Sequence, residues 1–257
     1  MKDILHKVDD AELILIGLGE EFDNEKSLKN IQHYDEVKEA LMASPYSWLF
    51  PAYQQLRREA SQDHVLEGLN KLAERLQDKN YFVVSTSTND GIRRVSWKEG
   101  RLVMPCGGSM MKQCTNGCPE ELIKVSEKDW IMIRELFQNG FEGIPEGFCL
   151  GYCSQCGKPY ILNNVYTEKY NEKGYLSDWQ IYTKWLQGTL NKKLFVLELG
   201  VGMQYPSIIR FPFEKIALYN NKAEIYRINE KLYYLGEELK QKGTSISKNA
   251  IDWLQCL

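Results

Sequence analysis

The sequence has few histidines and no long apolar run. It contains three histidines in 257 residues, none beyond His64, and no uninterrupted apolar segment approaches the roughly 18 residues of a membrane span. Two aspartates precede the first short apolar run, which is unlike a secretory signal peptide. We therefore expect a cytoplasmic chain that does not associate with a membrane.

The charge balance also lacks an excess of either sign. A formal net charge of -3 and a pI near 5.8 give no electrostatic reason to expect a nucleic acid or an anionic membrane as partner. Hydrophobic residues make up 43% of the chain, so it is a folded protein and not a disordered one. Its length allows one sizeable core, or a main domain with a smaller insert.

Cysteines, in contrast, are concentrated in one region. In a chain without a secretion signal, seven cysteines do not indicate disulfides. Clustering in a reducing compartment instead favours metal binding or thiol chemistry. Six of the seven lie in the centre of the chain: Cys106, Cys114, Cys118, Cys149, Cys153 and Cys156.

The apolar pattern predicts an α/β fold. Buried-type strands are expected within 11–22, 81–88, 193–202 and 222–229, with helical segments at 27–50, 52–80 and 247–257. Pro45 and Pro51 are expected to interrupt the helical segments. This alternation indicates a Rossmann-like, mostly parallel sheet with helices on both faces. Residues 95–164 break the rhythm and predict a small inserted module, dividing the chain into 1–94 with 165–257, and 95–164.

Three strand-end loops are candidates for ligand binding, because ligands of such sheets sit at the carboxyl ends of the strands. They contain Gly17-x-Gly19, the segment 86–90 and Gly200-x-Gly202. A Gly-x-Gly turn lets the backbone approach a pyrophosphate. The third glycine of the dinucleotide fingerprint is missing, however, and Glu20 and Glu21 put carboxylates where phosphate oxygens would lie. A strand-ending turn whose acidic residues cap a helix is the alternative.

Two cysteine pairs have the spacing of zinc knuckles. Cys114 and Cys118, with Cys153 and Cys156, would supply a tetrahedral four-sulfur site for a structural Zn²⁺ ion. Gly157 can take a positive φ where the backbone must bend. The segment between the pairs is longer than in the commonest spacing, so ordinary cysteines remain the alternative.

An aromatic-rich segment, 163–193, has helical spacing around Trp179, Tyr182 and Trp185. Core packing of a helix is the favoured interpretation. A binding groove for a peptide or a lipoyl-like arm is the alternative.

The order of these motifs resembles that of the Sir2 (sirtuin) family over nearly the whole chain. The family's Gly-Ala-Gly loop corresponds to 17–19, its Thr-Gln-Asn-Ile-Asp segment to 86–90, and its His-Gly pair to Cys106-Gly107, eight residues before Cys114. The two knuckles, the loop 200–202 and a strand ending in Asn229 complete the series. The stretch from Leu197 to Glu214 is similar to the class M sirtuins, a bacterial branch associated with protein ADP-ribosylation.

The resemblance implies an enzyme that splits NAD at the nicotinamide–ribose bond, in a cleft between a Rossmann-like domain and a zinc-ribbon module. Its partner would be a protein substrate with a modified or nucleophilic side chain. The implied catalytic residues are Cys106, Thr88 and Asp90. The implied cofactor-binding residues are Gly17, Gly19, Glu20, Thr86, Ser87, Thr88, Asp90, Gly200, Val201, Gly202 and Asn229.

Cys106 stands where the family has its catalytic histidine. A thiol ionises at about pH 8.5, so Cys106 would be a poor general base at neutral pH. ADP-ribosyl transfer or NAD hydrolysis is therefore favoured over lysine deacylation. Two alternatives stay open: a non-catalytic sirtuin-like module that binds NAD, ADP-ribose or a partner protein, and a redox-active or nucleophilic thiol at Cys106.

Overall fold

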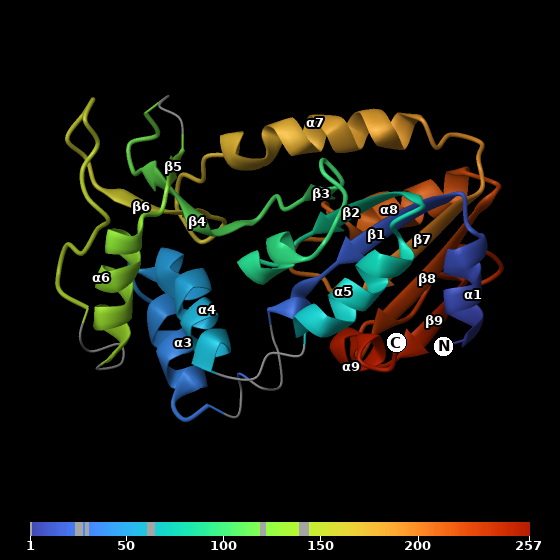
Figure 1. Cartoon of the computed structure of the whole chain (residues 1–257), viewed down its shortest axis with the longest axis horizontal. Coiled ribbons are helices and arrows are strands. Elements are labelled where there is room, and N and C mark those ends of the chain that lie inside the picture. The colour runs from blue at the N-terminus through green and yellow to red at the C-terminus, as the bar shows by residue number, and fades with distance from the viewer. Residues whose placement is uncertain (1, 24–27, 29–30, 61–64, 119–121, 139–143) are drawn as a thin grey trace.

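A six-stranded parallel sheet forms the larger part of the molecule (Figure 1). The computed structural model describes residues 2–23, 28, 31–60, 65–118, 122–138 and 144–257. The strand order is β3-β2-β1-β7-β8-β9, and every neighbouring pair runs parallel. The strands are β1 (Leu13–Leu18), β2 (Asn80–Ser85), β3 (Leu102–Val103), β7 (Leu194–Leu199), β8 (Ala223–Asn229) and β9 (Gly243–Ser247).

Helices cover both faces of this sheet, as the apolar pattern predicts. Every residue of β1 and β7 is buried, which a parallel strand requires when both of its faces are covered. One face packs against α1 (Lys2–Asp10), α5 (Val65–Arg75) and α9 (Ala250–Leu254). The other packs against α7 (Lys173–Gln187) and α8 (Arg210–Tyr219). The predicted Rossmann-like architecture is confirmed.

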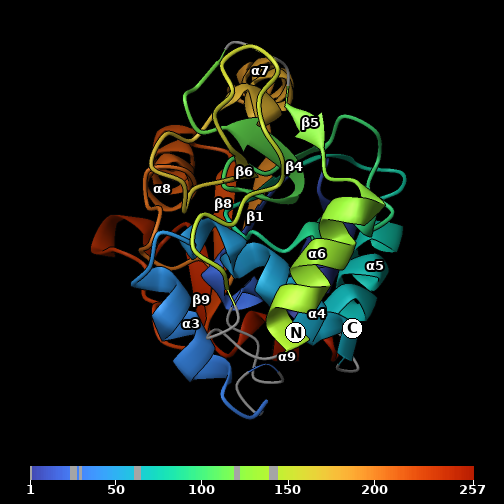
Figure 2. The same ribbon diagram turned by 90° about the vertical axis from the view of Figure 1, so that its left-hand side faces the viewer.

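A second, antiparallel sheet lies in the smaller part of the molecule, where α3, α4 and α6 are grouped (Figure 2). Its order is β5 (Ile123–Lys124), β4 (Gly107–Cys114), β6 (Tyr160–Asn164). One apolar cluster joins it to α3 (Tyr34–Met42), α4 (Phe50–Ala60) and α6 (Glu127–Gln138). The predicted division assigned α3 and α4 to the same part as the parallel sheet, whereas their apolar side chains pack with residues 114–162.

The four predicted strands are confirmed, and the prediction for one proline is wrong. Pro51 lies in the first turn of α4, where its missing N–H interrupts no helical hydrogen bond. Pro45 does separate α3 from a short 3₁₀ helix, η2 (Ser47–Leu49). The edge strand β9 escaped prediction because its half-exposed residues form no apolar run. The start of the helical segment predicted at 27–50 falls partly outside the described residues.

The aromatic segment packs as a helix, α7. Tyr182 is buried and contacts Phe82 with ring centroids 5.2 Å apart, while Trp185 lies 5.7 Å from the same ring. Core packing therefore accounts for this stripe of rings. Among the helices that the structure describes, none has the length and apolar character needed to cross a membrane.

Candidate functional site

The predicted cofactor-binding residues meet at the carboxyl edge of the parallel sheet. The loops after β1, β2, β7 and β8 are joined there by backbone hydrogen bonds. Gly19 N–H donates to Leu199 O at 2.9 Å, Thr86 N–H to Leu18 O at 2.9 Å, and Gly200 N–H to Ile228 O at 2.8 Å. The three strand-end loops that the sequence marks as candidates therefore lie side by side. Their side chains, however, are largely engaged with one another.

Gly17, near the end of β1, and Gly19, just after it, are both required by packing. A Cβ on Gly17 would lie 2.6 Å from Ile209, on the chain just before α8. A Cβ on Gly19 would lie 2.3 Å from the Cα of Val201. The glycines thus let the β1 loop pack directly on α8 and on the β7 loop. The Gly-x-Gly turn was expected to let the backbone approach a pyrophosphate, but here it lets the backbone approach Ile209 and Val201 of the same chain.

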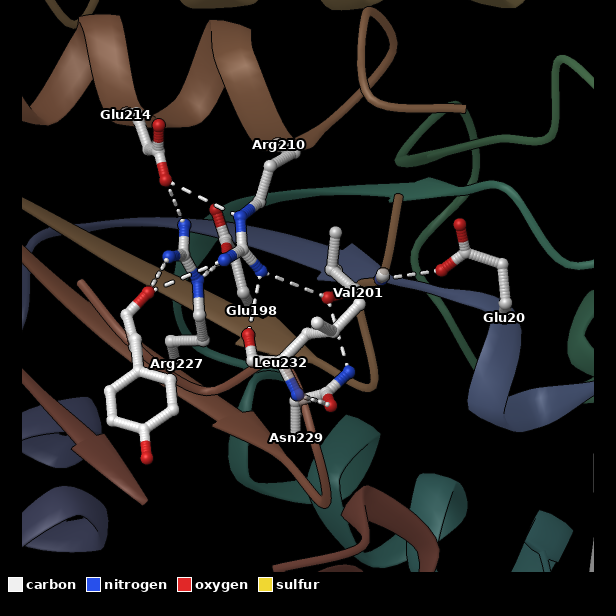
Figure 3. Close-up of polar contacts among 10 residues, drawn as sticks. Glu20, Glu198, Val201, Arg210, Glu214, Arg227, Asn229 and Leu232 are labelled. Carbon is white, nitrogen blue, oxygen red and sulfur yellow. Dashed lines mark hydrogen bonds and ion pairs between the residues drawn. The ribbon is translucent and has the colours of Figure 1, made fainter. Parts of the chain in front are cut away.

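Three acidic residues in four positions follow β1, and each points to a different loop. Both oxygens of Glu20 accept backbone hydrogen bonds from the loop after β7, at 2.5 Å from Gly202 N and 2.8 Å from Gln204 N. Figure 3 shows one of these contacts, beside Val201. Glu20 lies in a short 3₁₀ helix, η1 (Glu20–Phe22), which begins immediately after Gly19. Its carboxylate therefore occupies two backbone N–H donors at the carboxyl ends of the strands.

Glu21 accepts hydrogen bonds from segments that follow β8. Its two oxygens accept from Glu230 N at 2.7 Å and from Ala250 N, the first residue of α9, at 2.6 Å. Burial raises the pKa of its carboxyl group, although these two N–H donors partly oppose the shift. Its backbone-capping role agrees with the alternative that the sequence left open for the acidic pair.

Asp23 is buried and binds the loop after β2, and it was not among the predicted site residues. Its carboxylate accepts from Ser87 Oγ at 2.8 Å and from Thr88 N at 3.0 Å. Burial raises its pKa, and the positive charge of Arg58 partly opposes this effect. The sequence did contain a sign that Asp23 belongs to this site, because it is a third acidic residue close after Glu20 and Glu21.

The remaining polar groups of the 86–90 loop also have partners within the chain. Thr86 Oγ1 donates to Leu18 O at 3.4 Å. Asn89 Oδ1 accepts from Gly91 N at 2.9 Å and so caps the 3₁₀ helix η3 (Asp90–Arg94). These are the strand-end roles that compete with ligand binding for such side chains.

Asp90 connects the parallel sheet to the smaller part of the molecule. Its Oδ2 accepts from Ser109 N at 2.6 Å and Ser109 Oγ at 2.7 Å, while Arg93 Nε lies 3.4 Å from Oδ1. Ser109 belongs to β4, and a Cβ on Gly108 beside it would lie 2.5 Å from the Asp90 carboxylate. Asp90 also lines a cavity of about 410 Å³ with Arg93, Gly107 and Tyr170.

A buried ionic network supports the loop after β7 (Figure 3). Arg227 Nε and Glu198 Oε2 are 2.5 Å apart with no exposed side-chain surface, and Arg227 also donates to Glu214 at 2.7 Å. Arg210 and Asn229 both donate to Val201 O, at 3.2 and 3.1 Å. Sequence reasoning missed the ion pair, although opposite charges inside two apolar strands were a usable signal.

Cys106 is buried completely just before β4. Burial raises the pKa of its thiol, and the negative charges of Asp23 and Glu20 raise it further. The thiol is therefore protonated at neutral pH and is neither a base nor an activated nucleophile. This state weighs against the hypothesis of a reactive thiol at this position.

The four predicted metal ligands converge. The sulfur atoms of Cys114, Cys118, Cys153 and Cys156 all lie within 4.8 Å of one another. Gly117 and Gly157 have φ angles of +67° and +69°, so each pair bends through a glycine in the left-handed region. Asn116 N lies 3.4 Å from Cys114 Sγ, a contact that would orient a thiolate ligand. Four such sulfurs could hold a zinc ion, which would act as a structural staple.

Comparisons with known proteins identify the fold. No family model matches the chain. A protein ADP-ribosyltransferase of Staphylococcus aureus (strain Mu50 / ATCC 700699) is 19% identical over 178 residues, which are 68% of this chain and 55% of that protein. The chain thus spans about half the length of this curated relative.

Solved sirtuin structures align with at least 99% of the chain. A Sir2 protein bound to an acetylated peptide gives a TM-score of 0.56 at 11% identity, covering 100% of this chain and 96% of the other. A complex of a Sir2 homologue with NAD gives 0.56 at 12% identity, covering 99% and 91%. At such low identity the likeness concerns the fold. The chain therefore has the fold of the Sir2 (sirtuin) family, which its sequence motifs resemble.

Proposed function

We propose that this protein is a sirtuin-like NAD-dependent enzyme that cleaves the nicotinamide–ribose bond and transfers ADP-ribose to a protein side chain or to water. Lysine deacylation is disfavoured in this proposal. The observation that carries it is the complete burial of Cys106, the residue that corresponds to the family histidine in the sequence resemblance, because burial raises the pKa of its thiol. Location in the cytoplasm and a protein partner are parts of the same proposal.

The missing base decides between the two reactions. Nicotinamide departure develops positive charge on the ribose and needs orientation and negative charge more than a proton acceptor. Passing on an acyl group requires a base acting on a ribose hydroxyl. Asp90 provides a carboxylate in the wall of the 410 Å³ cavity, whereas the buried Cys106 thiol, with its raised pKa, is a poor proton acceptor. This cavity therefore suits the first step better than the second.

The fit of the site to NAD is divided. The Asp90 carboxylate, which lines the 410 Å³ cavity, suits a developing ribosyl cation. The backbone donors of Gly202 and Gln204, which suit a phosphate, are bound by Glu20. When bound, NAD would supply the ADP-ribosyl group. Zinc would hold the two cysteine pairs together without taking part in the reaction.

Parallel assays test the proposal. The purified protein is incubated with NAD labelled in its adenylate phosphate, while nicotinamide release, protein labelling and deacetylation of an acetyl-lysine peptide are measured. We expect nicotinamide release without deacetylation, and a loss of at least about tenfold in Asp90→Asn. Deacetylation at a rate matching nicotinamide release would contradict the preference. A folded protein that releases no nicotinamide would refute the enzymatic proposal.

A non-catalytic module that binds NAD, ADP-ribose or a partner protein is the second candidate. It is favoured by the carboxylate of Glu20 on the Gly202 and Gln204 donors, which opposes productive binding of a diphosphate. Nicotinamide release by the wild-type protein would eliminate this candidate.

A further inference from the structure

The backbone donors of Gly202 and Gln204 form a two-point anion site that is filled from within the chain. Glu20 Oε2 lies 2.5 Å from Gly202 N, and Oε1 lies 2.8 Å from Gln204 N. A carboxylate in this arrangement presents two oxygens and a negative charge, as one edge of a phosphate does. The site lies at the carboxyl ends of β1 and β7, where parallel sheets bind ligands.

The Gly202 donor is supported by contacts that do not involve Glu20, because Gly202 N shares a peptide group with Val201 O. Arg210 and Asn229 fix the carbonyl of Val201 from the other side of the loop (Figure 3). Gly200 N–H donates to Ile228 O at 2.8 Å, and Gly200 has a φ of +62°. Removal of the Glu20 carboxylate therefore leaves two N–H groups without that acceptor, and the one of Gly202 stays preorganised.

Glu20 differs from the acids that follow it. Glu21 lies against Gly200, where a Cβ would approach the Glu21 Cβ to 2.6 Å, and it connects two further loops. Asp23 is buried beneath the loop after β2. The Glu20 carboxylate contacts a loop whose outer residue, Gln204, is exposed. The Glu20 side chain can thus turn toward solvent without exposing the apolar core.

We infer that Glu20 is an internal anion that gates this site, so that a nucleoside-diphosphate ligand binds only after the Glu20 carboxylate has left the N–H groups of Gly202 and Gln204. The choice of ligand class rests on the proposed function. The gate itself rests on the two hydrogen bonds and on the independent support of the loop.

Calorimetric titration with ADP-ribose tests the gate, with adenosine as the ligand that carries no phosphate. We expect Glu20→Ala to bind ADP-ribose at least about tenfold more tightly than the wild type. The substitution removes the repulsion between the Glu20 carboxylate and the diphosphate, and it frees the N–H groups of Gly202 and Gln204 to donate to the phosphate oxygens. Glu20→Gln, which removes the charge but keeps an acceptor, should show a smaller gain. Adenosine affinity should not change. Glu99→Ala removes an equal charge at the opposite edge of the sheet and should leave ADP-ribose affinity unchanged.

The outcomes separate the gate from the enzymatic activity. If folded Glu20→Ala binds ADP-ribose no more tightly than the wild type, the gate is refuted. If that variant does not fold, an unchanged affinity in Glu20→Gln refutes it equally. An equal gain in adenosine affinity would also refute it, because the gate acts on the phosphates. Nicotinamide release by the wild type is measured separately, so a gain in ADP-ribose affinity with no release supports the gate while refuting the enzyme.

Discussion

The carboxyl edge of the parallel sheet and the cysteine end of the smaller part both gather polar groups from distant segments, with opposite results. At the sheet edge, carboxylates meet backbone N–H groups, a serine hydroxyl and an arginine, which are unlike partners. At the cysteine end, four like groups meet within 4.8 Å. Thiolates repel one another unless a cation lies between them.

The difference shows how to distinguish a site whose polar groups are already paired from one that needs a ligand. The convergence of polar groups does not by itself distinguish these two kinds of site. Unlike groups that pair with one another stabilise the fold and must be displaced before a ligand binds. Like groups gain stability only when the ligand arrives. Variants in the two regions should therefore differ in their dependence on added metal.

The largest effect is expected at the cysteine cluster. Cys153→Ser should abolish zinc binding and destabilise the smaller part by several kcal/mol, since a structural zinc site contributes on the order of 10 kcal/mol. Cys149→Ser, outside the cluster, is the matched control and should retain the metal. Zinc content and thermal unfolding provide the measurements. Less than about half an equivalent of zinc in the unchelated wild type would contradict the four-sulfur site.

A smaller loss is expected from the buried ion pair behind the β7 loop. Arg227→Met should lower the free energy of unfolding by about 3–5 kcal/mol, because Glu198 keeps a buried charge without its partner. Arg134→Met removes an exposed pair with Glu127 and should cost at most about 1 kcal/mol. Urea unfolding compares the two variants. Equal losses of unfolding free energy in the two variants would show that burial of the ion pair does not increase its effect on stability.

The two glutamates should differ from each other. Glu21→Ala should cost about 1–3 kcal/mol, because it strips the acceptors from Glu230 N and Ala250 N. Glu20→Ala should cost less, since water can reach the exposed Gln204. Unfolding in urea without ligand measures both. A larger loss in Glu20→Ala would make Glu20 a structural residue and weaken the contrast between them.

The smallest effect concerns pH. Because the folded pKa of Asp23 is raised, the folded state binds more protons than the unfolded state above about pH 4. The contribution of Asp23 to stability is thus greatest below that pH and is lost as the pH rises through the folded pKa. Asp23→Asn should therefore flatten the fall of unfolding free energy with pH. Asp78→Asn, at an exposed position, should leave the slope unchanged, and an unaltered slope in Asp23→Asn would contradict the assignment.

Much of the fold followed from local patterns. The buried strands are apolar runs, and the helices carry apolar residues at helical spacing. The metal ligands followed from close spacing within each cysteine pair, with Gly117 and Gly157 at the bends. The packing of α3 and α4 could not be predicted, because an amphipathic helix specifies its apolar face and not the element that covers it.

By itself, the sequence determined which loops lie at the carboxyl edge of the sheet, because the apolar runs show where each strand of a parallel sheet ends. Tertiary structure alone decided what the side chains of those loops do there. Glu20 reaches a donor 182 positions away, and Glu21 reaches one 229 positions away. A carboxylate binds whichever N–H groups folding brings within about 3 Å, and no local pattern encodes that distance.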